Sequence, residues 1–181
     1  VSYLSARFDE MQRNASIVEN NAKELLDKLR VFEIKIAAYL AQNKMLEGVN
    51  NMREALKLVG VKLPQKPGKL NVLAAIIKTK LLMRGKKIDD LKSLNRMEDP
   101  YKQAAMRIIA SGSSAAYYAM PSIFPLLIIK MVGLSIKYGN YRLSSPGYCT
   151  YGLIIIRGLG DINNGYQWGK FSLDLQGIVE G

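Results

Sequence analysis

Residues 115–137 read AAYYAMPSIFPLLIIKMVGLSIK, and this stretch decides the fold of the chain. Pro121 and Pro125 suit the first turn of a helix, where a missing N–H has no intrahelical partner. Gly139, just past the last apolar residue, predicts where that helix ends. The polar side chains within the apolar run are Lys130, Ser135 and Lys137. We therefore expect a helix that is apolar on nearly every face, either packed at the centre of the fold or spanning a membrane.

A membrane span is the less favoured of these two alternatives. A helix that crosses a bilayer needs roughly 20 predominantly apolar residues. The apolar run at 121–130 is shorter, and Lys130 lies near the middle of the whole stretch. A second apolar run, at 152–156, is cut by Arg157. We therefore expect the helix to be buried in protein, with no membrane span in the chain.

Length and composition predict one globular domain, 1–181. The chain has 181 residues, 49% of them hydrophobic, which is enough to build a substantial core. Its single cysteine, Cys149, excludes an internal disulfide, and its tyrosine neighbours predict a small buried side chain. Without signal or transit features, a cytoplasmic location is expected. The chain runs from Val1 to Gly181, which suggests a piece of a longer protein.

The composition argues against an enzyme. There is no histidine, the commonest general base and metal ligand. Residues 60–69 end in Gly-Lys, but their spacing is wrong for a phosphate loop and two prolines remove N–H donors. Residues 158–160 lack the later glycine and the preceding strand of a dinucleotide fingerprint. We therefore predict no catalytic residue, no cofactor and no metal site.

Positive charge is concentrated in the middle of the chain, whose net charge is +11. Residues 61–139 hold fourteen Lys and Arg against four Asp and Glu, whereas 1–60 and 140–181 are close to neutral. Clustered cations bind phosphates or an acidic protein surface, and the scarcity of aromatic residues nearby disfavours single-stranded nucleic acid. The candidate interaction surface consists of Lys78, Lys80, Arg84, Lys86, Lys87 and Lys92.

Helices are predicted along the whole chain, with essentially no sheet. In the N-terminal part, 1–60, they are expected at 1–6, 8–21, 25–42 and 45–58. Asn43-Lys44 makes the turn between the last two, and Gly60 ends the fourth. A loop at 61–70, with two prolines and a glycine, separates this part from the C-terminal part, 71–181.

The C-terminal part is expected to contain helices at 72–84, 88–94 and 99–110, then the central helix and two more. Asn71 is the predicted cap of the first, and Asp99-Pro100 begins the third. Ser111-Gly112-Ser113 predicts a break before the central helix. Ser144-Ser145-Pro146 begins the penultimate helix, and Gly160-Asp161 turns the chain into the last. The acidic pairs are expected to cap helices or face solvent rather than bind metal; they are Asp89-Asp90 and Glu98-Asp99.

Short turns between helices of this length predict antiparallel hairpins. The tetratricopeptide repeat, with a period near 34, has small and aromatic residues at intervals that this chain matches. One copy comprises Phe32, Tyr39, Gly48, Met52 and Ala55. A weaker copy lies one unit earlier and comprises Phe8, Met11, Ala15 and Val18. A second weaker copy, near the end of the chain, comprises Gly160, Asp161, Ile162, Gly165, Gly169 and Ser172. We expect an all-α fold of antiparallel hairpins stacked as a degenerate tetratricopeptide-like superhelix, in which Gly48 lets two helices approach closely.

The chain also resembles a known family through longer motifs. These are Ala115-Ala116-Tyr117-Tyr118-Ala119, Phe124-Pro125-Leu126, Lys130-Met131, Lys137-Tyr138-Gly139-Asn140 and Tyr151-Gly152-Leu153, with 58–64 earlier and Gly165-Tyr166 and Gly169-Lys170 later. They are similar to the helical region of very large bacterial hybrid sensor kinases. In those chains the region lies beside an AAA-like NTPase module, with serine/threonine kinase, GAF and histidine kinase domains. The resemblance implies a connector between domains and carries over no catalytic residue.

Two functions are therefore expected, in order. The first is a non-catalytic helical scaffold that contacts neighbouring domains of its own chain or a protein partner. The second is a helical arm of an NTPase-type transcription regulator that senses a nucleic acid or a ligand through the lysine cluster. The sequence favours a protein partner over a nucleic acid and leaves the oligomeric state open.

Overall fold

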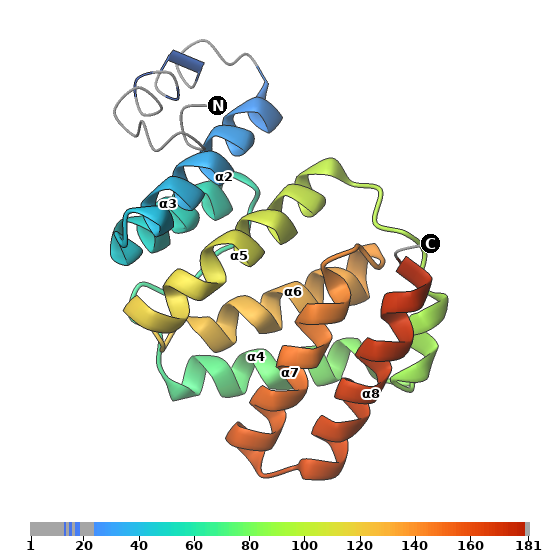
Figure 1. The fold of residues 1–181 in the computed structure, drawn as a ribbon. Coiled ribbons are helices and arrows are strands. Elements are labelled where there is room, and N and C mark those ends of the chain that lie inside the picture. Colours follow the sequence, from blue (N-terminus) through green and yellow to red (C-terminus); the bar gives the residue numbers. More distant parts are fainter. Residues whose placement is uncertain (1–12, 14, 16, 19–23, 180–181) are drawn as a thin grey trace.

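The computed structural model describes residues 13, 15, 17, 18 and 24–179, and it is all-helical (Figure 1). The named elements are α2 (Leu25–Ala41), α3 (Met45–Leu58), α4 (Lys69–Leu82), the 3-10 helix η1 (Asp89–Ser93), α5 (Pro100–Ala119), α6 (Phe124–Tyr138), α7 (Ser144–Leu159) and α8 (Ile162–Val179). Within the described residues the only strand-like pairing is an isolated bridge between Arg96 and Asn140. The prediction of an all-α fold is confirmed. The predicted helices at 1–6 and 8–21, with Phe8 and Met11, fall almost wholly outside the described residues.

The predicted central helix is α6. It packs on α4, α5 and α7, and its side chains at Leu127, Met131 and Val132 are buried. It ends where expected, because Gly139 has a φ of 101°, a value that L side chains rarely adopt. It begins only at Phe124, since 115–119 belong to the end of α5. None of the helices described in the structure has the length and apolar character of a membrane span.

The predicted break at Ser111-Gly112-Ser113 is wrong, because α5 runs unbroken from Pro100 to Ala119. Ser111 and Ser113 donate their hydroxyls to carbonyls of the preceding turn, at 2.9 Å each, and so stay within the helix. Gly112 is buried where α5 crosses α3: a Cβ added there would lie 2.5 Å from Met52 Sδ and 3.1 Å from Met52 Cβ. Its role is therefore close packing of two helices.

Several predicted helix ends are confirmed, and one cap is corrected. Asp99 caps α5, its Oδ1 accepting hydrogen bonds from the N–H groups of Tyr101 (2.9 Å) and Lys102 (3.2 Å). Gly60 and Gly160 have positive φ just past α3 and α7. Asn71, however, lies inside the first turn of α4, which starts at Lys69. Its side chain accepts from the N–H of Gly68 at 2.9 Å, so Gly68 is the cap residue.

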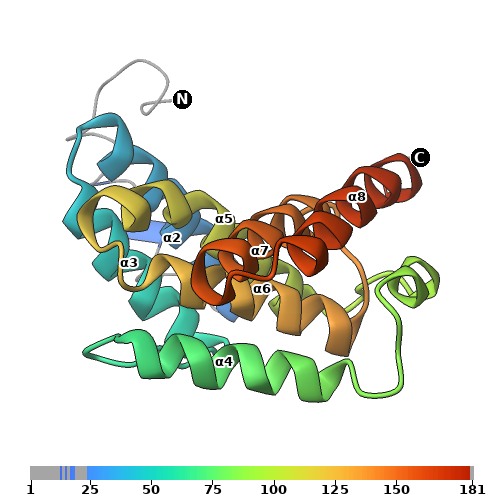
Figure 2. The ribbon, with the colours of Figure 1, turned by 90° about the horizontal axis from the view of Figure 1, so that it is seen from below.

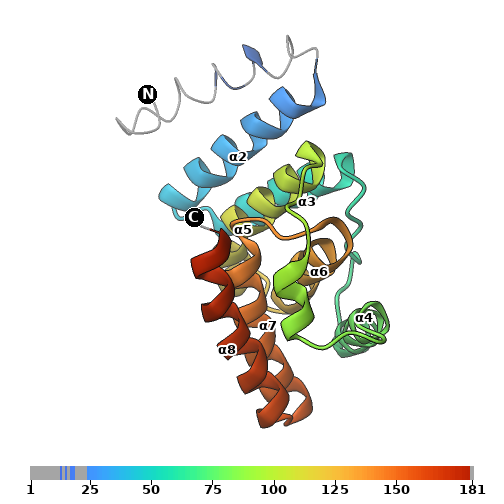
Figure 3. The same ribbon diagram turned by 90° about the vertical axis from the view of Figure 1, so that its right-hand side faces the viewer.

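Two antiparallel hairpins, α2–α3 and α7–α8, each place a glycine of the second helix against the first. A Cβ at Gly165 on α8 would collide with Ile156 on α7 and lie 2.7 Å from the carbonyl oxygen of Gly152, so this glycine allows the two helix backbones to approach closely. A Cβ at Gly48 on α3 would lie 2.9 Å from Leu40 Cδ1, the flexible end of a side chain on α2, and the next atoms are 3.7 Å away. The close approach predicted at Gly48 is therefore tighter at Gly165. Figures 2 and 3 show α7–α8 side by side and α4 along the outer edge of the molecule.

Cys149 is exposed, which corrects its prediction as a buried side chain. The inner face of α7 is occupied by residues at helical spacing, namely Tyr148, Tyr151, Gly152 and Ile155, all of them buried. Position 149 lies about 100° around the helix from position 148, because a turn contains about 3.6 residues. Its tyrosine neighbours in sequence therefore do not enclose it.

Asn140, immediately after Gly139, is buried and joins two distant segments. Its backbone N–H donates to Asn95 O at 2.9 Å, and its carbonyl accepts from the N–H of Met97 at 2.8 Å. Its side-chain Nδ2 donates to Leu91 O at 2.7 Å, and its Oδ1 accepts from the hydroxyl of Tyr148 at 3.2 Å. The start of the α6–α7 connection is thereby fixed against the segment that leads from η1 to α5.

The crossing of α3 and α5 gives a stability prediction with an internal control. Gly112→Ala gains up to about 1 kcal/mol of helix propensity but loses about 1–3 kcal/mol to overpacking against Met52, so we expect net destabilisation. Gly169→Ala, on α8 with no atom within 4 Å of the added Cβ, is expected to stabilise by about 0.5–1 kcal/mol. Urea unfolding of both variants measures the difference. Equal stabilisation by the two substitutions would contradict the close crossing.

Candidate interaction surface

The six predicted cations fall on three successive elements. Lys78 and Lys80 lie on α4, and Arg84, Lys86 and Lys87 follow in the link to η1. These five side chains are exposed, whereas Lys92, on η1, is partly buried. The structure therefore brings the set to one region of the surface but does not place all of its members in one site.

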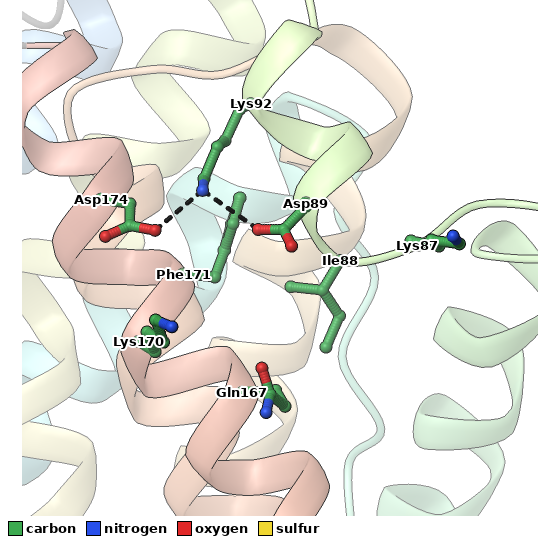
Figure 4. A pocket seen from close by; sticks show the side chains of 8 residues that line it. All are labelled: Lys87, Ile88, Asp89, Lys92, Gln167, Lys170, Phe171 and Asp174. Carbon is green, nitrogen blue, oxygen red and sulfur yellow. Dashed lines mark hydrogen bonds and ion pairs between the residues drawn. The ribbon is translucent and has the colours of Figure 1, made fainter.

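Two neighbouring pockets form a groove: the larger lies between the link, η1 and α8 (Figure 4), and the smaller also borders α4 and α7. Its larger part has a volume of about 350 Å³ and is lined by Lys87, Ile88, Asp89, Lys92, Gln167, Lys170, Phe171 and Asp174. Its smaller part has a volume of about 190 Å³ and is lined by Thr79, Lys80, Met83, Lys86, Ile88, Tyr151, Asn164 and Trp168. Ile88 borders both parts. The groove is open and carries cations along both sides.

Lys92 forms ion pairs with two carboxylates of its own chain. Its Nζ lies 2.8 Å from Asp174 Oδ2 on α8 and 3.0 Å from Asp89 Oδ1 on η1, and Figure 4 shows it reaching between the two carboxylates. Hydrogen bonds to Asp174 and Asp89 raise the pKa of Lys92, and the bond from Lys92 lowers the pKa of Asp174. Lys92 therefore fastens η1 to α8, and its charge is balanced within the groove.

The acidic residues Asp89, Asp90 and Asp99 make local contacts. Asp90 Oδ2 accepts from the backbone N–H of Lys87 at 2.7 Å, just before η1. Asp89 pairs with Lys92, and Asp99 caps α5. In the part of the chain that the structure describes, no three His, Cys, Asp or Glu residues lie close enough together to hold a metal ion.

A cluster of aromatic side chains lies beneath the groove, and three of them line it, namely Tyr151, Trp168 and Phe171. Tyr148, Tyr151, Trp168 and Phe171 are buried and contact one another, with Tyr148 stacked on Trp168 at 5.4 Å between ring centroids. Burial raises the pKa of Tyr151 to about 12. Tyr117, Tyr118 and Tyr166 are exposed and line neither part of the groove. Of these tyrosines, Tyr148 and Tyr151 therefore belong to the core, where they fill the space between helices.

The contribution of α8 to the groove could not be found by sequence reasoning. Lys170 and Gln167 lie opposite the link, but residues 140–181 are neutral overall, so no charge cluster pointed to them. The single tryptophan, Trp168, was the one available signal, since it lies one turn from both Asn164 and Phe171 on the same helix. What brings these residues to the lysine cluster is the return of the chain in the α7–α8 hairpin.

Lys78 faces a different neighbour from the rest of the cluster. Lys130, on α6, is partly buried, and burial lowers its pKa, with a further lowering by the positive charge of Lys78. Lys78 thus belongs to the surface formed by α4 and α6, away from the groove. Arg84 lines neither part of the groove.

The arrangement is suited to binding anionic groups or an acidic protein surface through exposed lysines. Searches of protein-family models, curated protein sequences and solved structures find no match to this chain.

The ion pairs of Lys92 give a pH prediction. The pKa of Asp174 is lower in the folded protein than its ordinary value of 3.8. The ionised carboxylate of Asp174 therefore contributes its full stabilisation above pH 3.8, and this stabilisation disappears as the pH falls through the pKa of the folded state. Asp174→Asn should therefore lower the melting temperature at neutral pH and low salt, and the difference from the parent chain should vanish well below pH 3.8. Equal melting temperatures at neutral pH would show that the ion pair between Lys92 and Asp174 contributes nothing measurable to stability.

Proposed function

We propose that this chain is a non-catalytic helical scaffold that connects protein domains by direct contact. The observation that carries the proposal is a glycine at the same place in the α2–α3 and α7–α8 hairpins. Gly48 and Gly165 occupy the same position in the repeat pattern read from the sequence, and each lies on the second helix of its hairpin against the first. A glycine at the matching position of two hairpins in a single chain is expected of a degenerate tetratricopeptide-like repeat.

Two separate hairpins suit a connector. Among the described elements α2–α3 packs on α5 and α7 packs on α6, so each hairpin offers a long helical surface to other proteins without moving a catalytic group. The resemblance of residues 115–140 to the helical region of bacterial hybrid sensor kinases supports a place between an NTPase module and sensor or kinase domains. We accordingly propose a role in cytoplasmic signal transduction.

Calorimetric titration tests the connector role. The chain is mixed with each of the domains that adjoin the similar helical region in hybrid sensor kinases, and we expect association with at least one of them, at micromolar or tighter affinity (about 8 kcal/mol or more). Gly165→Val, which prevents closure of α7–α8, should weaken the association, whereas Gly169→Ala should leave it unchanged. Absence of heat with every adjoining domain would contradict the proposal.

A second candidate function, binding of a nucleic acid or another anionic ligand, rests on the groove. Lys80, Lys86, Lys87 and Lys170 border it, and none of these four lysines makes an ion pair among the described residues. The groove base is aromatic but buried, so stacking on bases is limited to the edges of Tyr151 and Trp168. These lysines would contact phosphates rather than read a sequence.

Filter binding over a salt series separates the two functions. If the groove binds nucleic acid, affinity for duplex DNA should fall steeply between about 50 mM and 200 mM salt, and Lys86→Ala with Lys87→Ala should reduce the slope of that dependence. The scaffold proposal predicts weak retention that these substitutions do not change. Tight binding with a steep salt slope would establish the second function instead.

A further inference from the structure

The outer side of α4 carries an uncovered apolar stripe. Leu70 is 81% exposed, Leu73 45%, Ile77 51% and Leu81 64%. The opposite side of the same helix packs on α6 and buries Ile76 and Thr79. Figures 2 and 3 show α4 at the edge of the molecule from two directions. A helix that is apolar on both sides is normally covered on both, so α4 lacks one of its expected neighbours.

The same side of α4 has the spacing of a helix–helix seam. Leu70, Ala74, Ile77 and Leu81, with Leu73 beside them, form this seam: the four follow one another at intervals of four, three and four residues, the alternation of the two core positions in a heptad. All four side chains are exposed. Isolated apolar residues on a surface need no explanation, but a row of them in register along one helix marks a docking surface.

Cations flank this seam. Lys78 and Lys80 stand at the two positions next to it, where the charges of paired helices select the partner. Residues 55–88 contain no Asp or Glu, so the flanks of α4 have no negative charge of their own. Lys78 also lies near the partly buried Lys130, and this repulsion would be relieved by a carboxylate placed between them.

Other occupants fit this surface less well. A second copy of α4 would bring lysines against lysines. A membrane surface is disfavoured, because helices that lie in the bilayer interface commonly carry Trp or Phe on their apolar face, and residues 40–100 contain no aromatic residue. Nucleic acid would use the lysines and leave the leucines in water.

We propose that the outer face of α4 docks an amphipathic helix of a partner protein, with an apolar seam flanked by Glu or Asp. The inference rests on the proposed scaffold function and specifies the chemistry of one partner. The apolar seam supplies most of the affinity, and the acidic flanks of the partner select it through Lys78 and Lys80.

The probe is a pair of synthetic peptides of about four heptads, with Leu at both core positions and either Glu or Lys at all flanking positions. Fluorescence anisotropy with the full chain should give micromolar binding of the Glu peptide and at least about tenfold weaker binding of the Lys peptide, a difference of about 1.4 kcal/mol. Vesicles of anionic phospholipid are included as a third probe.

Three variants locate the binding. Ile77→Ser with Leu81→Ser should abolish binding of the Glu peptide and, because both side chains are exposed, leave the helical content unchanged by circular dichroism. Lys78→Glu with Lys80→Glu should reverse the preference in favour of the Lys peptide. Leu173→Ser, which removes a 72% exposed leucine on α8, is the matched control and should bind as the parent chain does.

The outcomes distinguish this inference from the scaffold function. Equal binding of the two peptides, binding that survives Ile77→Ser with Leu81→Ser, or preferential binding to vesicles would overturn the docking proposal. If the adjoining domains bind while the Glu peptide does not, the scaffold function stands and the docking proposal fails. If the Glu peptide binds while the domains do not, the connector role fails and the docking surface remains.

Discussion

The fold depends on one buried residue, Asn140, whose backbone and side chain each make two hydrogen bonds. It meets Asn95, Met97 and Leu91 through their backbones and Tyr148 through its hydroxyl. A buried polar group left without its hydrogen-bond partner lowers the stability of the fold by about 1–3 kcal/mol. Moving Asn140 out of place would leave several such groups unsatisfied at once. Gly139 is needed beside it, because a side chain there would collide with the carbonyl of Asn95. The end of the central helix is thereby tied to a segment some fifty residues earlier in the chain.

The hydrogen bonds of Asn140 set the position of the C-terminal half. They hold η1 where Lys92 reaches Asp174, and this contact closes one end of the groove. The N-terminal hairpin is attached differently, through the close crossing at Gly112 and the paired Glu33 and Arg107, which join α2 to α5. Because α4 packs on α6 alone among its main contacts, its second apolar side is left for a partner. The groove and the exposed outer face of α4 thus both result from the way the helices pack on one another.

Sequence reasoning succeeded where the signal is local. Asp99, Gly139 and Gly160 were read correctly as helix boundaries, because capping and positive φ depend on adjacent residues. It failed where the partner is distant in the chain: Gly112 resembles a helix breaker until Met52 is placed beside it. The same limit applies to the candidate surface. Lysine clustering was visible, but the engagement of Lys92 by Asp174 and the approach of Lys170 arise from the folding back of α8.

Hydrogen exchange in Asn140→Ala measures directly whether Asn140 holds the C-terminal half in place. We expect much faster exchange at the amide of Met97, which donates to residue 140, and in η1 and the facing part of α8. Protection in α2 and α3 should be unchanged, because their contacts with α5 do not involve this residue. Unchanged protection at Met97, or equal loss of protection throughout the chain, would contradict the claim that Asn140 fixes the C-terminal half independently of the N-terminal hairpin.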